Sequence, residues 1–460
     1  METLLTPVML SRIQFAATAM FHIIWPVLTI GLSIFLLVME ILWLKTREDV
    51  YFRHFQFWSR LFLLNFTVGA VTGIPMEFQF GTNWSGFSLA GGDVLGHLLG
   101  FEGAMAFMLE ATFLSIMMFG WKRVSPGMHL LATALVAFAG SLSAFWIMVA
   151  NSWMHTPTGG FMKDGRFVIT SHFQAIFNPD MPWGVSHMWV ACLEISIFVV
   201  GGLSAWYMLR NRHTSFFLHS FKVAVLAAIV ITPLQIWLGD GSGQSVFEYQ
   251  PAKLAGIESH WHTNPPGEGA PWHILAWPDA AGQENAWAIS IPNGLSLVTT
   301  RTLTGPVKGL ADFPPGDRPP VVIPFYAFRI MIAIGFALFV LMLWTLWAWH
   351  KGRLTSDLVP GQRRLLQAWV IAIPLSYVAM QAGWVTREVG RQPWVLYNLV
   401  RTEESATSLA AGTVGSSLLI FSIVYTLLFI LFLVFARRMV VRGPNIEKVR
   451  KQEYHPGIIS

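Results

Sequence analysis

The sequence contains little cysteine and little charge. Only one of its 460 residues, Cys192, is a cysteine. This excludes an internal disulfide framework and any cysteine-ligated zinc or iron–sulfur site. Charged residues make up 12% of the chain, whereas a soluble domain carries about a quarter. The first ten residues, METLLTPVML, show neither a basic segment nor a small-residue cleavage site, so we expect the first apolar run to be a mature span rather than a removed signal.

Long apolar runs take the place of the missing charge. Apolar residues make up 54% of the chain, and runs such as 23–44 and 417–435 approach the roughly 20 residues that cross a bilayer as a helix. We therefore predict an all-α polytopic membrane protein with nine transmembrane helices. Their expected ranges are 14–44, 54–79, 95–120, 128–152, 184–209, 218–239, 323–349, 365–387 and 413–436.

Lysine and arginine gather in alternate connections. They occur in 45–60, 121–127, 210–222, 351–364 and the C-terminal tail, whereas 80–94 has none. Because cytoplasmic loops of membrane proteins are enriched in basic residues, we expect the N-terminus outside and the C-terminus in the cytoplasm. The net charge of +5 thus comes from basic residues at the helix ends, as membrane insertion requires. No nucleic-acid partner is expected.

The apolar pattern divides the chain into three parts. Residues 1–239 carry six of the expected helices, and residues 323–460 carry three more and the basic tail. Between them, 240–322 is an outer segment rich in proline, glycine and tryptophan. A loop of this length between closely spaced helices is more often functional than idle. The alternative is an extracytoplasmic cap with no chemistry.

Polar residues inside the spans gather at one depth, in the outer half of the membrane. A charge in the hydrocarbon core costs about 2.5–3.5 kcal/mol on insertion scales, so this convergence suggests a site. Haem iron suits a set of histidine, methionine and carboxylate, because a His/Met pair gives an electron-transfer haem and a lone ligand leaves a position open. Arginines would pair with propionates. The residues are His22, Glu102, Glu110, His187, Arg329, Met331, Arg387, Glu388 and Arg391.

Residue types and spacing alone leave two functions open. A single helical histidine is often only a packed residue, and a methionine is ordinarily core filler. Glu102 and Glu110 lie eight residues apart, about 80° around an ideal helix and roughly 12 Å along it. Together with Glu194 they suit the proton relay of a membrane transporter without haem, which is the alternative to a haem-containing redox protein.

Several motifs carry a resemblance to a known family. The chain resembles subunit I of the cytochrome bd quinol oxidases from about residue 10 to the last span, in the family's order. The motifs are LSRIQFAATAMFHIIWPVLTIG (10–31), MEFQFGTNWS (76–85), EGAMAFMLEATF (102–113), ALVAFAGSLSAFWIMVANSWM (134–154), GLSAWYML (202–209), KLAGIE (253–258), FRIM (328–331) and GWVTREVGRQPW (383–394).

The resemblance implies an enzyme that oxidises quinol on the outer side and reduces O2 to water with protons from the cytoplasm. His187 and Met331 would be the axial ligands of a low-spin haem b. His22 and Glu388 would be the protein ligands of two high-spin haems, a second haem b and haem d, with their order left open. Arg329 and Arg391 would neutralise propionates, and Trp384 would pack among the haems.

The resemblance also assigns proton and quinol residues. Glu102 would lie beside the oxygen-reducing haem, with Glu110 behind it on a proton path lined by Ser143 and Asn151. Lys253 and Glu258 in KLAGIE would act on ubiquinol or menaquinol. Glu194 has no counterpart in this set, and it is either an extra proton site or a residue paired toward another subunit.

The outer segment departs from some family members because it runs from TRTLTGPVKGLADF almost directly into PPGDRPPVV. This is the short-loop form linked with cyanide-insensitive oxidases, in which a further haem b can replace haem d. The resemblance implies a heterodimer with oxidase subunit II, a small single-span accessory subunit in some members, and a bacterial cytoplasmic membrane location. A third alternative is a haem-bearing sensor or assembly subunit without turnover.

Overall fold

Nine membrane-length helices form the body of the molecule. The computed structural model of the chain describes residues 6–446, and within them nine helices are long and apolar enough to cross a membrane. This confirms the predicted spans. They are α1 (Pro7–Thr46), α2 (Asp49–Thr82), α3–η2–α4 (Ser85–Phe119), α5 (Pro126–His155), α7 (Met181–Leu209), α8 (Thr214–Tyr249), α11 (Val322–His350), α12 (Arg363–Val389) and α14 (Ala411–Arg442).

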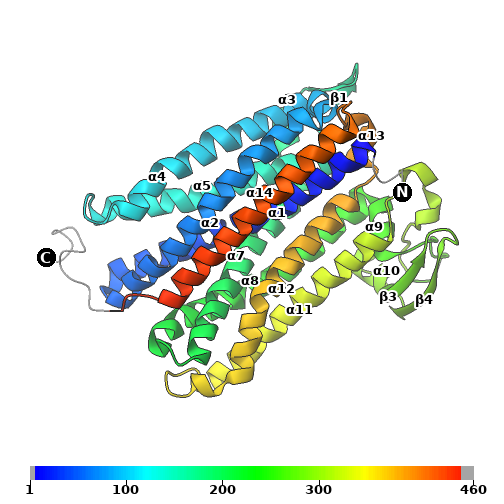
Figure 1. The fold of residues 1–460 in the computed structure, drawn as a ribbon. Helices are drawn as coiled ribbons and strands as arrows, with labels where there is room; N and C mark the ends of the chain where they lie inside the picture. Colours follow the sequence, from blue (N-terminus) through cyan, green and yellow to red (C-terminus); the bar gives the residue numbers. More distant parts are fainter. Residues whose placement is uncertain (1–5, 447–460) are drawn as a thin grey trace.

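The helices run roughly side by side along one long axis (Figure 1). The start of α1 and the elements of the 240–322 segment lie at one end of the bundle, and the end of α14 lies at the other (Figure 1). An odd number of spans produces this arrangement, so the structure agrees with termini on opposite sides of a membrane.

Short local signals set where two of the helices begin. The Thr6 hydroxyl accepts a hydrogen bond from the Met9 amide at 3.2 Å, directly before Pro7 at the start of α1. The Ser125 hydroxyl does the same for the Met128 amide at 3.3 Å, before Pro126 at the start of α5. A capping hydroxyl followed by proline is a favoured helix start, because proline lacks only an N–H that has no partner there.

The third span is interrupted rather than a single α-helix. A π-helical turn, η2 (Glu102–Phe107), separates α3 (Ser85–Phe101) from α4 (Met108–Phe119). π-turns are rare and are frequently found at functional sites. Because the wider turn changes the rotation per residue, the ideal-helix angle between Glu102 and Glu110 does not apply.

The sixth span is longer than its apolar run. Helix α8 continues through the polar residues 240–249 to Tyr249, ten residues beyond the expected end. Two contacts hold this extension. Ser245 donates a hydrogen bond to Asp180 at 3.2 Å. Gly241 packs so closely on Trp183 that a Cβ at this glycine would lie 2.1 Å from the indole. Hydropathy therefore located the membrane part of the helix but not its end.

The segment after α8 is folded. It contains α9 (Pro251–Glu258), the antiparallel hairpin β3 (Trp272–Asp279) and β4 (Glu284–Ile291), and α10 (Gly294–Thr300). Two smaller hairpins, β1 (Gly160–Lys163) with β2 (Arg166–Ile169) and β5 (Trp394–Leu396) with β6 (Val400–Arg401), lie in other connections. Among the described residues this end also contains α6 (His172–Ile176), α13 (Thr402–Ser405) and the 3-10 turns η3 (Leu310–Asp312) and η4 (Pro315–Asp317).

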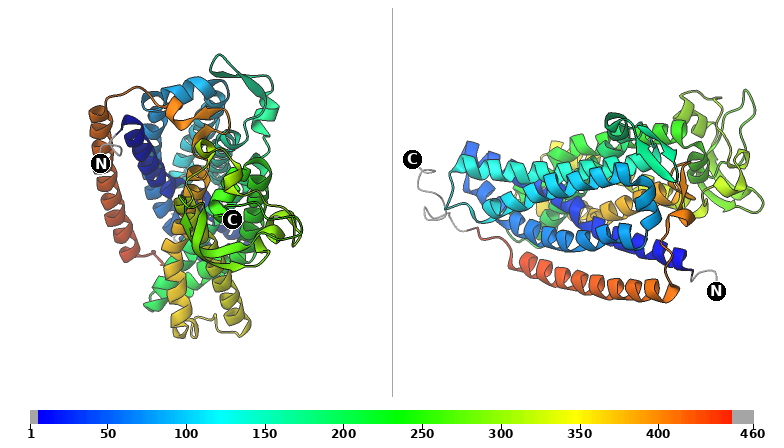
Figure 2. Two further views of the ribbon diagram at one scale, coloured as in Figure 1. Left: turned by 90° about the vertical axis from the view of Figure 1, so that its right-hand side faces the viewer. Right: turned by 90° about the horizontal axis from the view of Figure 1, so that it is seen from above.

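The helices differ greatly in how much of them is buried. α7 lies inside the bundle, packed against α1, α5, α8 and α12. More than half of its most apolar 18-residue stretch is buried. α14 lies along the edge of the bundle in both views of Figure 2, with only Val414 and Tyr425 buried along it. The apolar surface of α14 is therefore left for lipid or another subunit to cover.

Candidate functional site

His22 on α1 is oriented by the neighbouring helix α2. Its Nδ1 lies 2.9 Å from the Thr72 hydroxyl oxygen, and that hydroxyl donates to the Val68 carbonyl at 2.9 Å. The Thr72 oxygen is thus available to accept from Nδ1–H, which leaves Nε2 with its lone pair. This orientation is typical of a metal-ligating histidine. A Cβ at Gly73 would lie 3.1 Å from the imidazole, so glycine there gives the ring room.

His187 and Met331 lie on helices that share both neighbours. α8 and α12 each pack against both α7, which carries His187, and α11, which carries Met331. This arrangement places α7 and α11 across the interior from each other, as a haem with two axial ligands requires. The His187 Nδ1 is buried without a hydrogen-bond partner among residues 6–446.

Both side chains also have a glycine against them. A Cβ at Gly239 would lie 3.4 Å from the His187 ring, and one at Gly383 would lie 3.0 Å from the Met331 sulfur. Together with Gly73 beside His22, each of these three predicted ligands packs on a glycine of an adjacent helix.

Glu388 lies at the end of α12 among hydrogen-bond donors. Its Oε1 accepts from Asn151 Nδ2 at 2.8 Å and lies 3.4 Å from His155 Nε2, while Oε2 forms an ion pair with Arg391. The Glu388 side chain is nevertheless 34% exposed, so one side of the carboxylate faces open space. The three side chains thus hold the Glu388 carboxylate in place while part of it stays accessible. A carboxylate with these two properties is suited to bind an iron.

Arg387 connects Glu388's neighbours to the outer segment. The Arg387 guanidinium donates to Asn151 Oδ1 at 2.6 Å and to Asp180 Oδ2 at 2.5 Å. Its backbone carbonyl accepts from the Lys253 ammonium at 3.0 Å. Burial alone would raise the pKa of Asp180, but the Arg387 charge outweighs it and holds that pKa well below its usual range.

Lys253 is buried on α9, with 3% of its surface exposed. Burial, with the nearby Arg387 charge, lowers its pKa from the usual 10.5 to about 7. An amine with this pKa changes its charge close to neutral pH, and titration near the operating pH favours proton transfer.

Glu258, five residues further along α9, is paired with Arg329. The Arg329 Nη2 donates to Glu258 Oε2 at 2.5 Å, and the Arg329 Nε donates to the His273 carbonyl at 2.7 Å. Burial raises the pKa of Glu258, and the Arg329 charge acts in the opposite direction. Sequence reasoning assigned Arg329 to propionates. In the structure one nitrogen holds Glu258, and only Nη1 is left without a partner among the described residues.

The two glutamates of the third span contact α5. Glu102, in the π-helical turn, accepts a hydrogen bond from the Ser143 hydroxyl at 2.7 Å. Glu110 is 6% exposed and faces Gly140, where an added Cβ would lie 3.4 Å from its Oε1. Asn151 was expected on the same path, but its side chain forms hydrogen bonds with Arg387 and Glu388. The structure therefore divides Ser143 and Asn151 between two sets of contacts.

The remaining two predicted residues are inside the bundle. Trp384 packs against a core cluster that includes Val27, Cys192 and Met380, and its Nε1 is buried without a hydrogen-bond partner in the described chain. Glu194 on α7 is 9% exposed and has no hydrogen bond or ion pair to another residue of 6–446. A carboxylate buried in this way is normally neutral or occupied by a partner from outside the described chain.

The unpaired donors test whether haem groups fit these residues. Buried N–H groups without partners are rare and cost about 1–3 kcal/mol each. Five of the sixteen buried side-chain atoms that lack partners within residues 6–446 belong to predicted site residues: Arg391 Nε and Nη1, Arg329 Nη1, Trp384 Nε1 and His187 Nδ1. Propionate carboxylates would satisfy the two arginines. The residues present therefore fit the groups expected.

Sequence reasoning missed several polar residues that the fold brings together. His155, 1% exposed at the end of α5, links Glu388 to Gln250, whose Nε2 lies 3.1 Å from His155 Nδ1 and donates to its carbonyl at 2.7 Å. Asp180, next to α7, was also missed. Their only sequence signal is a polar residue directly at the end of an apolar run, which is common and nonspecific.

A second missed cluster lies in the other half of the bundle. The Glu40 carboxylate on α1 is bonded to His129 Nδ1 at 2.7 Å and to the Thr133 hydroxyl at 2.6 Å, both on α5. All three residues are almost completely buried. Here a signal was present, since Glu40 interrupts the run LLVMEILWL.

Comparisons with known proteins show the family of the chain. The family model for cytochrome bd terminal oxidase subunit I matches residues 10–444. The chain is 33% identical to the cytochrome bd-II ubiquinol oxidase subunit 1 of Escherichia coli K12, over 95% of this chain and 96% of that protein. It is 33% identical to the cytochrome bd ubiquinol oxidase subunit 1 of Bacillus subtilis 168, over 95% and 94%.

A solved structure shares the fold as well. The bd oxidase from Geobacillus thermodenitrificans superposes with a TM-score of 0.87 at 31% sequence identity, covering 95% of this chain and 99% of the matched chain. The family match, together with nine membrane-length helices, places the protein in the bacterial cytoplasmic membrane. The chain belongs to the cytochrome bd terminal oxidase subunit I family and is the haem-binding quinol oxidase subunit that works in a complex with subunit II.

Proposed function

We propose that this subunit oxidises quinol at the outer end of the bundle and passes the electrons inward to a site where O2 is reduced. One observation carries the proposal. The two residues predicted to act on quinol touch the neighbours of two predicted haem ligands: Glu258 contacts Arg329, two residues before Met331, and Lys253 contacts the carbonyl of Arg387, next to Glu388. A quinol bound at α9 would thus lie close to the electron acceptors.

Each haem would be held by residues already described. His187 and Met331 would bind a low-spin haem b, which supplies one-electron transfer at a raised potential. His22 and Glu388 would bind a high-spin haem b and either haem d or a further haem b, which supply the O2 chemistry. Arg329 Nη1 and the free nitrogens of Arg391 would hold propionates, and Trp384 would pack beside the groups.

Quinol oxidation releases two protons and two electrons, and the α9 residues would handle the protons. Glu258 would accept a hydroxyl proton from quinol, with Arg329 holding the carboxylate in place. Lys253, whose pKa is lowered to about 7, would stabilise the developing anion when protonated. Both residues are at least 95% buried, so their charges act in a medium of low dielectric and affect the substrate strongly.

Protons for O2 reduction would come from the opposite side. Reducing one O2 to two waters consumes four electrons and four protons. Glu110 and Glu102, with Ser143 bonded to Glu102 at 2.7 Å, would hold protons along this path. Asn151 would orient Glu388. By the positive-inside rule the quinol end is outside, so turnover builds a proton gradient without a dedicated pump.

The substrate is ubiquinol or menaquinol, and the similar Escherichia coli and Bacillus subtilis proteins are ubiquinol oxidase subunits by name. The short outer segment favours the cyanide-insensitive type, and a small single-span accessory subunit completes the proposed complex. Glu194 would serve as an extra proton site or pair toward another subunit.

The test of the proposal is Glu258→Gln in the purified two-subunit complex. The amide keeps the shape but cannot accept a proton, so we expect quinol-dependent haem reduction to fall at least about a hundredfold, in line with the usual contribution of a general base. Dithionite should still reduce all haems. Glu248→Gln, at the exposed end of α8, is the matched control. Normal quinol turnover in Glu258→Gln would refute the assignment of α9.

A further inference from the structure

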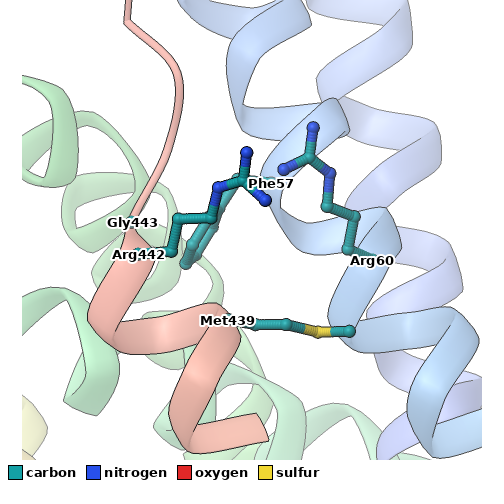
Figure 3. A pocket seen from close by; sticks show the side chains of 5 residues that line it. All are labelled: Phe57, Arg60, Met439, Arg442 and Gly443. Carbon is teal, nitrogen blue, oxygen red and sulfur yellow. The ribbon is translucent and has the colours of Figure 1, made fainter. Parts of the chain in front are cut away.

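A cavity lies at the end of the bundle opposite the quinol segment. It has a volume of about 290 Å³ and opens between α2 and the last turn of α14, where Phe57, Arg60, Met439, Arg442 and Gly443 line it. Figure 3 shows the Arg60 and Arg442 guanidinium groups reaching into the same space from the two helices, with Met439 crossing below them. None of the predicted haem, quinol or proton residues lines this cavity.

Within the described residues, positive charge gathers at this cavity and no acidic side chain lines it. Among residues 6–446 neither Arg60 nor Arg442 has an ion pair or hydrogen-bond partner. A third guanidinium stands behind Gly443, because a Cβ built on this glycine would lie 3.7 Å from Arg212 Nη2. Bringing like charges together is unfavourable unless an anion lies between them.

Part of the site is held firmly. Arg212 donates to the Val441 carbonyl at 3.1 Å, and the Tyr207 hydroxyl donates to the Val440 carbonyl. These bonds fix the last turn of α14 against the connection between α7 and α8. Phe57 is 4% exposed and packs its ring 5.6 Å from that of Phe217. These contacts fix Gly443 and Phe57 on two sides of the cavity.

An apolar track leads away from the cavity along α14. Leu427, Leu431 and Phe435 are 55%, 51% and 45% exposed, and their spacing of four residues places them on one face of the helix. A phospholipid has an anionic headgroup and apolar acyl chains. The headgroup matches the anion-binding mouth of the cavity, and the acyl chains match the exposed apolar stripe, whereas a free anion would use only the mouth.

We propose that this cavity binds the phosphate of an anionic phospholipid from the membrane leaflet at the C-terminal end. Arg60 and Arg442 contact the phosphate oxygens, and an acyl chain follows the Leu427, Leu431 and Phe435 stripe. Guanidinium groups suit this role because their planar donors match phosphate oxygens. The site is independent of the haem and quinol assignments.

The test measures lipid retained by the purified holo-complex in native mass spectrometry, with dioleoylphosphatidylglycerol as the probe and dioleoylphosphatidylcholine as the neutral comparison. We expect the wild type to retain phosphatidylglycerol in preference, and R60Q/R442Q to bind it about tenfold more weakly or worse, because two charge-assisted contacts are lost. R363Q/R364Q removes the same charge at the exposed start of α12 and should leave retention unchanged. The haem spectrum should be unchanged in both variants.

Three results would overturn the proposal. The first is equal phosphatidylglycerol retention in the wild type and R60Q/R442Q. The second is displacement of the bound species by millimolar inorganic phosphate with no preference between the two lipids, which would indicate a free-anion site. The third is loss of subunit II from R60Q/R442Q with lipid retention intact in the remaining chain, which would assign the arginines to an acidic partner side chain.

Discussion

At the residue scale, Arg329 pairs with Glu258, and substituting Arg329 tests what this pairing does to the Glu258 carboxylate. It holds Glu258 by a 2.5 Å contact and keeps one further nitrogen free. Because the Arg329 charge lowers the pKa of Glu258 against the effect of burial, Arg329→Gln raises that pKa. The proton-accepting form of Glu258 then appears only at higher pH.

The measurement is kcat/KM for quinol against pH in wild type and Arg329→Gln. We expect the acidic limb to move to higher pH, and Arg318→Gln, in the same outer segment, to leave it in place. An acidic limb that does not move, with activity retained, would show that Glu258 is not the group whose ionisation limits quinol oxidation.

Met331 provides a second test at this scale. Its sulfur packs on Gly383, and leucine has a similar volume without a ligand atom, so the substitution costs little packing energy. We expect Met331→Leu to abolish the low-spin haem b signal and to spare O2 binding at the high-spin pair. Met342→Leu, buried on the same helix, is the control. An unchanged low-spin band would remove Met331 from the ligands.

At the element scale, α5 carries the contacts to both glutamate systems. Ser143 bonds Glu102, whereas Asn151 bonds Glu388. Removing the Ser143 hydroxyl eliminates one hydrogen bond, with a net value of about 0.5–1.5 kcal/mol. We therefore expect Ser143→Ala to slow O2 consumption roughly two- to twelvefold at unchanged haem content.

The control for Ser143 is Thr67→Ala, whose exposed hydroxyl bonds only within α2. The measurement is steady-state O2 consumption with excess quinol, together with haem quantification. Lost haem in Ser143→Ala would assign a structural role to the hydroxyl, and wild-type turnover would exclude it from the proton path.

The same scale shows what sequence could and could not predict. Nine spans were predictable because each needs a local run of apolar residues, and their centres agree with the structure. The end of α8 at Tyr249 was not, because its last ten residues are polar and depend on Trp183 and Asp180 of another segment. The π-turn at Glu102–Phe107 has no local signal that separates it from an α-helix.

Side-chain partners were predictable only in part. The resemblance to a family identified Glu258 and Arg329 but not their contact, which joins residues 71 apart in the chain. Similarly, no pattern joins His155 to Glu388, 233 residues away. Such pairs are set by tertiary packing, and a single sequence carries no record of them.

At the scale of the whole molecule, the arrangement separates two chemistries along one axis. The folded segment 240–322 and the start of α1 lie at one end, and the basic C-terminal end of α14 lies at the other (Figure 1). Between them α7, α8, α11 and α12 enclose the predicted ligands. The exposed apolar length of α14 is left for lipid or another subunit to cover.

The central claim is that haem is held by the predicted ligands that pack on glycines and by the buried side chains whose nitrogens lack partners within residues 6–446. The most direct test is the reduced-minus-oxidised optical spectrum of the purified complex, with extraction and identification of its haems. The account predicts b-type bands. A long-wavelength chlorin band accompanies them if haem d is present, and the b-only type shows the b-type bands alone. A properly folded complex without any haem would contradict the account.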